Sequence, residues 1–163
     1  MKNTVAYHEA GHAVVEFFLF GKVKKVSIIP GKEFQGQTTS YSVKNLDPDI
    51  DFSPRTKDNL EKIIVIFYAG NEATKRFKGR YDYIGSQSDY KKIGNISIYL
   101  TTGGKAEGYF LKYLRERAKD LVKHHWSSVV ALAEQLMVKK TMETKEIEDA
   151  IRCSWKGGKQ NDT

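Results

Sequence analysis

The sequence has little cysteine and no long apolar run. Its single cysteine, Cys153, cannot form an internal disulfide, so we expect a reducing, cytoplasmic setting. The longest apolar run, residues 63–70, is far shorter than the roughly 20 residues that a membrane-spanning helix requires. The apolar stretch near the N-terminus is interrupted by His8, Glu9 and His12, which makes it a poor signal peptide. We therefore expect neither export nor a membrane anchor in this chain.

A concentrated charge of one sign is also lacking. The net charge is +7 over 163 residues, but the basic residues are spread along the chain. The densest basic cluster holds only Lys75, Arg76, Lys78 and Arg80. Nucleic-acid binding would require a basic stripe on a known binding module, and the sequence has neither. We expect a solvated basic surface and no nucleic-acid partner.

One stretch, residues 5–14, carries a recognisable chemical pattern. It contains His-Glu-x-x-His, from His8 to His12. On a helix these two histidines lie one turn apart on one face and can bind one zinc ion, which leaves Glu9 free to act on a metal-bound water. Gly11 between them would let another backbone approach the site, or would simply allow tight helix packing. The alternative interpretation of the motif is a chance match on an apolar helix with two hydrogen-bonded histidines.

Hydrophobic periodicity predicts a mainly α fold with a small antiparallel β element after the first helix. We expect one domain over residues 1–155 and a flexible tail over 156–163. Two strands are expected over 24–30 and 37–43, with a turn at 31–33. Helices are expected at about 4–20, 54–77, 86–100, 106–124, 127–139 and 144–153.

A catalytic zinc site needs a third protein ligand besides the two histidines. No further histidine closely follows His12, and the adjacent pair His124 and His125 is interpreted as surface residues, because neighbours on a helix do not face together. Two carboxylates remain. Glu72 lies in a helical context similar to that of thermolysin-like enzymes, but much farther from the motif than in those enzymes. Asp89 lies near a helix start, where the helix dipole favours a carboxylate, and is preferred on that ground, although it could merely cap its helix.

Besides the His-Glu-x-x-His motif, several stretches match a known family in order and rough spacing: residues 5–14, 25–30, 69–70, 85–89, 131–136 and 146–147. On these stretches the chain resembles the peptidase domain of the FtsH family, the ATP-dependent zinc metalloproteases. The resemblance implies a mostly helical peptidase domain with a small β element. It also implies zinc held by His8, His12 and Asp89, with Glu9 as the catalytic base.

The sequence departs from that family in two respects: the ATPase module and the surroundings of the site. The family joins this domain to a membrane segment and an AAA ATPase, whereas this sequence has no phosphate-binding Gly-x-x-x-x-Gly-Lys-Ser/Thr loop. Thr74 and Lys75 replace the family's acidic residues after the Ala-Gly pair. ATP-driven unfolding and a hexamer are therefore in doubt, and a homo-oligomer or an ATPase supplied in trans stays open. The chain could be a stand-alone homologue or an excised domain.

The hypothesis from sequence is a zinc-dependent endopeptidase that hydrolyses unfolded or flexible polypeptides, with Glu9 activating the attacking water. Either predicted strand could offer an edge to an extended substrate. The alternative is a catalytically inactive, zinc-stabilised protein-binding module on the same scaffold.

Overall fold

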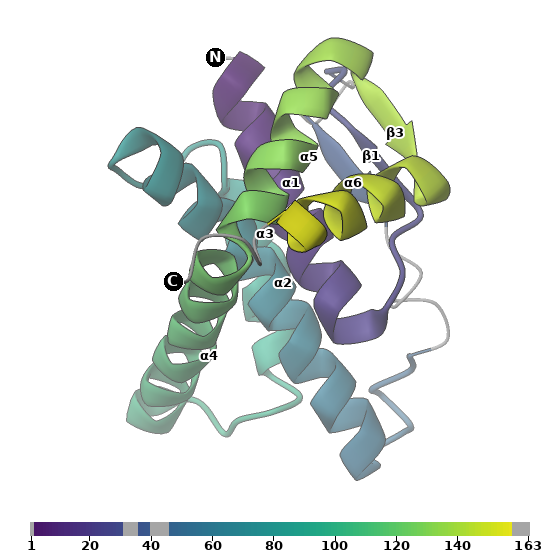
Figure 1. Ribbon diagram of the computed structural model, residues 1–163. Coiled ribbons are helices and arrows are strands. Elements are labelled where there is room, and N and C mark those ends of the chain that lie inside the picture. The colour runs from purple at the N-terminus through teal and green to yellow at the C-terminus, as the bar shows by residue number, and fades with distance from the viewer. Residues whose placement is uncertain (1, 31–35, 40–45, 158–163) are drawn as a thin grey trace, which may run out of the picture.

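The computed structural model describes residues 2–30, 36–39 and 46–157 (Figure 1). These residues confirm a mainly α fold with a small antiparallel sheet after the first helix. The described strands are β1 (Lys25–Ser27), β2 (Gln37–Thr39) and β3 (Thr141–Glu143). The described helices are α1 (Lys2–Phe20), α2 (Pro54–Lys78), α3 (Gln87–Ser97), α4 (Gly104–His124), α5 (Trp126–Lys139) and α6 (Thr144–Gly157).

Helix α1 is the centre of the hydrophobic core. Its alanines and valines at positions 6, 10, 13, 14 and 15 are completely buried, on more than one side of the helix. The helix packs against α2 and α5 and also meets the sheet. Gly21 ends it in a left-handed conformation with φ of 78°, and its N–H donates to the Phe17 carbonyl. A helix so enclosed can hold polar side chains only where they find partners.

Helix α2 begins and ends as its sequence predicts. The Ser53 hydroxyl accepts a hydrogen bond from the Thr56 N–H at 3.2 Å, and Pro54 occupies the first turn. Gly79, with φ of 80°, ends the helix. This helix packs against α1 and against α4.

The sheet has three strands in the order β2-β1-β3, all antiparallel, where the sequence predicted two. Strand β3 was missed because three residues between two helices are too few for a period-2 pattern. Strand β1 is also shorter than predicted, and both of its edges are occupied, which leaves it no free edge for a substrate. The predicted turn at 31–33 and the end of the second strand, 40–43, lie outside the described residues.

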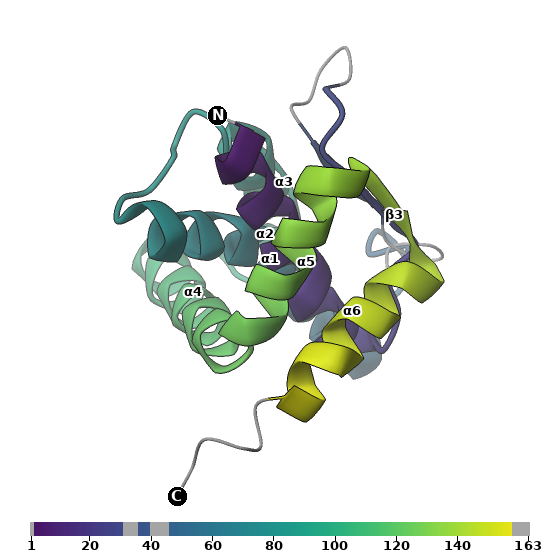
Figure 2. The same ribbon diagram turned by 45° about the horizontal axis from the view of Figure 1, so that its top comes forward.

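The last three helices cover the core from two sides. Helix α5 packs on α1, and α4 packs on α2. In Figures 1 and 2, α4 and the sheet lie on opposite sides of α1 and α5. Helix α3 ends at Ser97, earlier than predicted, whereas α6 continues to Gly157, past the predicted start of the tail at 156. None of the described helices is long and apolar enough to cross a membrane.

Candidate metal centre

His8 and His12 lie one turn apart on α1, with their side chains together as the sequence predicts. Their ring centroids are 4.6 Å apart and the rings are nearly perpendicular. The two Nε2 atoms are only 3.0 Å apart. His12 is buried and His8 partly buried, so both rings are largely withdrawn from solvent.

Helix α2 forms the wall behind these rings through an unusually close approach to α1. A Cβ atom added to Gly11 would lie 2.7 Å from the Ala69 carbonyl oxygen and 2.6 Å from the Ala73 side chain. On the facing helix, a Cβ atom on Gly70 would lie 2.4 Å from His12 Nε2. The small residue between the histidines therefore does admit another backbone, and a second glycine makes room for the imidazoles.

Backbone and side-chain acceptors determine how the neutral histidines are protonated. The His12 Nδ1 atom lies 2.7 Å from the Ile66 carbonyl oxygen, which can only accept, so Nδ1 carries the hydrogen. The Thr74 hydroxyl donates to the Gly70 carbonyl at 3.0 Å and is left to accept from His8 Nδ1 at 3.3 Å. In their neutral forms both rings therefore point an Nε2 lone pair into the same space.

Asp89, in the first turn of α3, completes the cluster. Its Oδ2 atom lies 3.0 Å from His8 Nε2 and 3.2 Å from His12 Nε2. Lys92 lies on the outer side of this carboxylate, with Nζ 3.8 Å from Oδ1. Within the described part of the chain, these are the three residues whose donor atoms gather closely enough to hold a metal ion.

The electrostatics of the cluster reflect the need for a positive charge. Burial lowers the pKa of His12, but the charge and hydrogen bond of Asp89 outweigh it and raise the pKa to about 9. Burial raises the pKa of Asp89, but His12 and then His8 outweigh it and hold this pKa well below its usual range. Three acceptor atoms that converge in this way are stable only with a proton or a cation among them.

Glu72, the other carboxylate that the sequence left open, lies outside this cluster. Its side chain is buried, but the Arg115 Nε–H donates to Oε1 at 2.9 Å. The Tyr81 hydroxyl lies 3.3 Å from Oε2 and donates to it. Glu72 is therefore occupied by an ion pair between α2 and α4, and the structure brings Asp89 to the histidines in its place.

Glu9 lies beside the histidines and is also buried. Its carboxylate is reached from β2, where the Thr38 hydroxyl is 2.9 Å from Oε2. Sequence reasoning missed Thr38, and it also missed the roles of Gly70 and the Ile66 carbonyl. Thr74 had been noted only as a departure from the family, whereas in the structure it orients His8. Contacts between side chains this far apart in the chain leave no local pattern in a single sequence.

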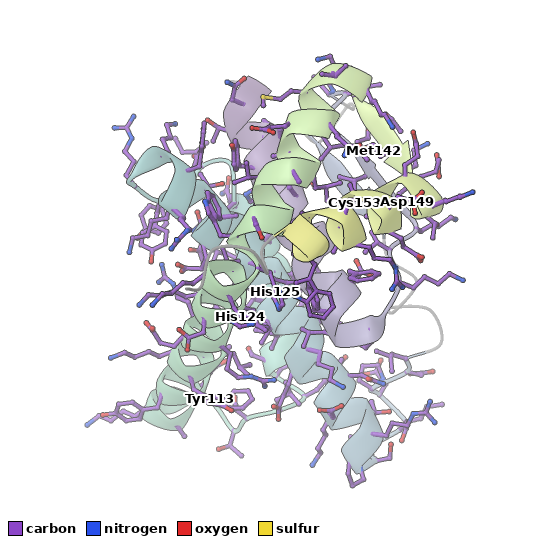
Figure 3. The ribbon with its side chains drawn as sticks, viewed as in Figure 1. Tyr113, His124, His125, Met142, Asp149 and Cys153 are labelled. Atoms are coloured by element: carbon purple, nitrogen blue, oxygen red, sulfur yellow. The ribbon has the colours of Figure 1, made fainter. Side chains whose placement is uncertain are left out.

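The second histidine pair, His124 and His125, is not part of the cluster of His8, His12 and Asp89. Figure 3 labels both histidines where α4 ends and α5 begins. His124 is exposed, as expected of a surface residue. The expectation for His125 was wrong, because its ring stacks on Phe18 at 3.5 Å between centroids and is partly buried. Burial and then the neighbouring His124 lower the pKa of His125 to about 4.

Comparison with known proteins places this site in a family. The sequence profile of peptidase family M41 matches residues 1–103, which include the whole candidate centre. The chain belongs to peptidase family M41. The resemblance noted from the motifs is thereby confirmed.

Curated relatives within the family are ATP-dependent zinc metalloproteases named FtsH. The protein of Mycoplasmoides gallisepticum is 34% identical over 105 residues, or 62% of this chain, and that of Ruminiclostridium cellulolyticum is 34% identical over 103 residues, again 62% of the chain. The FtsH of Chlorobium luteolum is 28% identical over an alignment that takes in 99% of the chain. The chain spans only 13%, 16% and 28% of the length of these three proteins.

Proposed function

We propose that this M41 domain is a zinc-dependent endopeptidase in which His8, His12 and Asp89 bind the metal. The observation that supports it best is the convergence of three lone-pair-bearing atoms, with both histidines donating their other ring hydrogen away from the site. Their separations of 3.0 to 3.2 Å are close to the edge of about 3.3 Å of a tetrahedron with zinc–ligand bonds of 2.0–2.1 Å. Two imidazoles and one carboxylate are also ligands that zinc prefers, and a three-ligand set keeps one position for chemistry.

Zinc in such a site would act as a Lewis acid that polarises a carbonyl and lowers the pKa of water to about 7. Glu9 would remove the proton from the attacking water and deliver it to the leaving amine. Glu9 lies close enough to His12 for its charge to raise the pKa of that imidazole, yet its carboxylate is not one of the three groups that converge. The α2 backbone at Gly70 and the apolar surroundings of α1 exclude bulk water from behind the imidazoles.

The substrate we propose is an extended, unfolded or flexible polypeptide. Strand β2 lies at one edge of the sheet and contacts Glu9 through Thr38. A peptide that paired with this edge would run past the candidate base, and main-chain hydrogen bonds would bind it with little sequence preference. Folded substrates would need an unfolding ATPase, acting in trans or joined to this domain.

The test is zinc analysis combined with cleavage of casein as an unfolded substrate. We expect about one zinc per chain and cleavage by the parent. Glu9→Gln should retain zinc and lose about 100-fold or more of the activity, because general base catalysis is typically worth that much. Casein cleavage by Glu9→Gln at the parental rate would contradict the role of Glu9.

The alternative, a zinc-stabilised module without activity, predicts a different result from the same experiment. The parent would then bind zinc and stay fully folded, but neither it nor Glu9→Gln would cleave casein. Spectroscopy of a cobalt-substituted protein would separate the two further, since an open fourth position binds added inhibitor and a closed structural site does not.

A further inference from the structure

The contact between β2 and Glu9 involves two oxygen atoms of Glu9. The Thr38 hydroxyl lies 2.9 Å from Glu9 Oε2 and 3.2 Å from the Glu9 backbone carbonyl oxygen. Both of these oxygens accept, so the hydroxyl is the donor. Thr38 thus engages the side chain and the backbone of the same residue.

The sheet register determines which way Thr38 faces. Thr38 pairs with Val26 on β1, and Val26 pairs with Met142 on β3. Residues directly opposite each other on antiparallel strands direct their side chains to the same face of the sheet. Val26 and Met142 are completely buried in the core, so the Thr38 side chain is held on the face turned toward α1. Figure 3 labels Met142 on β3, at the other end of this row.

A glycine lets the strand come this close. A Cβ atom added to Gly36 would lie 2.8 Å from both Cγ and Oε1 of Glu9, and equally close to Val5. Gly36 is not among the described residues with positive φ, so its backbone does not itself require glycine. The close approach of this residue to the Glu9 and Val5 side chains is what excludes a larger side chain.

We propose that Thr38 is a positioning residue for Glu9, the catalytic base. This inference rests on the proposed peptidase function. The Thr38 hydroxyl holds one carboxylate oxygen of Glu9, so the side chain keeps one rotamer and the other oxygen is presented to the attacking water. Gly36 is the second part of the device, because it sets the distance between β2 and the carboxylate. A carboxylate that is oriented before the reaction lowers the activation barrier more than one that must be ordered during the reaction.

The primary test replaces the hydroxyl while preserving shape. Thr38→Val should lower kcat by about 10-fold to 100-fold, with KM on an unstructured fluorogenic peptide and zinc content unchanged, since loss of such a supporting contact typically costs that much. Thr38→Ser restores the donor and should recover most of the lost kcat. A purely structural Thr38 would instead leave kcat at the parental value when measured below the unfolding transition, and that result would overturn the proposal.

Gly36→Ala provides an independent variant in case Thr38→Val folds poorly. It keeps the hydroxyl but pushes on the carboxylate, so kcat should again fall with zinc content unchanged. Gly108→Ala on α4 is the matched control, because a Cβ atom there has no neighbour within 4 Å, and it should leave kcat unchanged. Equal kcat values for both alanine variants would contradict the role of Gly36.

A measurement without catalysis separates this inference from the proposed function. In metal-free protein, the urea midpoints of Thr38→Val, Glu9→Ala and the double variant should be non-additive, because the two side chains share one contact. Additive changes in the urea midpoints would show that Thr38 and Glu9 do not interact, even if the parent cleaves peptides. Non-additive midpoints in the metal-free variants, together with a zinc-loaded parent that cleaves nothing, would support the contact and reject the peptidase assignment.

Discussion

The part of the molecule that the family profile matches, residues 1–103, differs in its interior from the part that follows, residues 104–157. Among the described residues, every buried polar or charged side chain except Ser128 belongs to the first part. The interior of α4, α5 and α6 is built almost entirely from leucine, isoleucine, valine and alanine. Burying polar groups is costly unless they find partners, and Glu9, His12 and Asp89 find theirs within residues 1–103.

The second part nevertheless supports the first through a few specific contacts. Helix α5 packs on α1, and β3 completes the sheet that carries Thr38. Arg115 on α4 neutralises Glu72 on α2. We infer that changes in residues 1–103 should affect metal binding and activity, whereas changes in residues 104–157 should affect stability.

Within residues 1–103, the largest expected effect on zinc binding and activity comes from a change at Asp89. Asp89→Ala should abolish stoichiometric zinc binding and reduce activity by more than about 100-fold, because even outer-shell losses at metal sites cost 10-fold to 100-fold. Metal analysis after dialysis and the casein assay measure both. Asp82→Asn, a change to a carboxylate in the preceding loop that accepts from the Gly85 N–H, is the control. Full zinc content in Asp89→Ala would remove Asp89 from the ligand set.

The matching change on the second side is Leu132→Ala on α5. Leu132 is completely buried, so the substitution should lower the free energy of unfolding by about 2–5 kcal/mol. Chemical denaturation of the metal-free protein measures this loss. The specific activity of the folded protein at low temperature should stay near the parental value. A large activity loss without destabilisation would break the division between the two parts.

The next prediction concerns Gly70 on α2, the helix that packs both on α1 of the first part and on α4 of the second. Gly70→Ala tests how closely α2 must approach the histidines. The new methyl group would occupy space 2.4 Å from His12 Nε2, so zinc affinity should fall by about 10-fold to 100-fold, the range for disturbed ligand orientation. Competition with a zinc-binding dye measures the affinity. Alanine is otherwise favourable in a helix by about 1 kcal/mol relative to glycine. Unchanged zinc affinity would mean that the helices separate without disturbing the site.

The smallest effect concerns His125, where the second part meets Phe18 of the first. Its folded-state pKa of about 4 lies below its ordinary value of 6.5, so its stabilising contribution is complete above pH 6.5 and is lost as the pH falls toward 4. His125→Phe keeps a ring on Phe18 but cannot be protonated. In metal-free protein its stability should therefore fall less than that of the parent between pH 7 and 4.5, by about 1–2 kcal/mol after allowance for solvent screening.

His124→Gln is the control for this comparison. Burial is the larger cause of the shift, so most of the pH dependence should persist when the neighbouring charge is removed. Parallel stability profiles for His125→Phe and the parent would show that the His125 ring is fully exposed in solution, contrary to its stacking on Phe18.

The elements with strong local signals were predicted well, and the short or long-range ones were not. Ser53, Pro54 and Gly79 place the ends of α2 because caps act within one turn. Strand β3 had no such signal, since its three residues depend on pairing with β1, more than a hundred residues earlier. His125 was misjudged for the same reason, because its burial depends on Phe18 of α1.

The helical elements, the turn that pairs His8 with His12, and the placement of Glu9 between them could be predicted from sequence, because each depends on neighbours within four or five residues. The residues alone favoured Asp89 over Glu72 without excluding Glu72, and the resemblance implied Asp89; the folded core brings Asp89 beside the imidazoles and pairs Glu72 with Arg115. Only the tertiary structure decided which ring nitrogens carry hydrogen and which strand reaches Glu9. These contacts join segments that are 29 to 81 residues apart, and only packing of the whole core brings them within hydrogen-bonding distance.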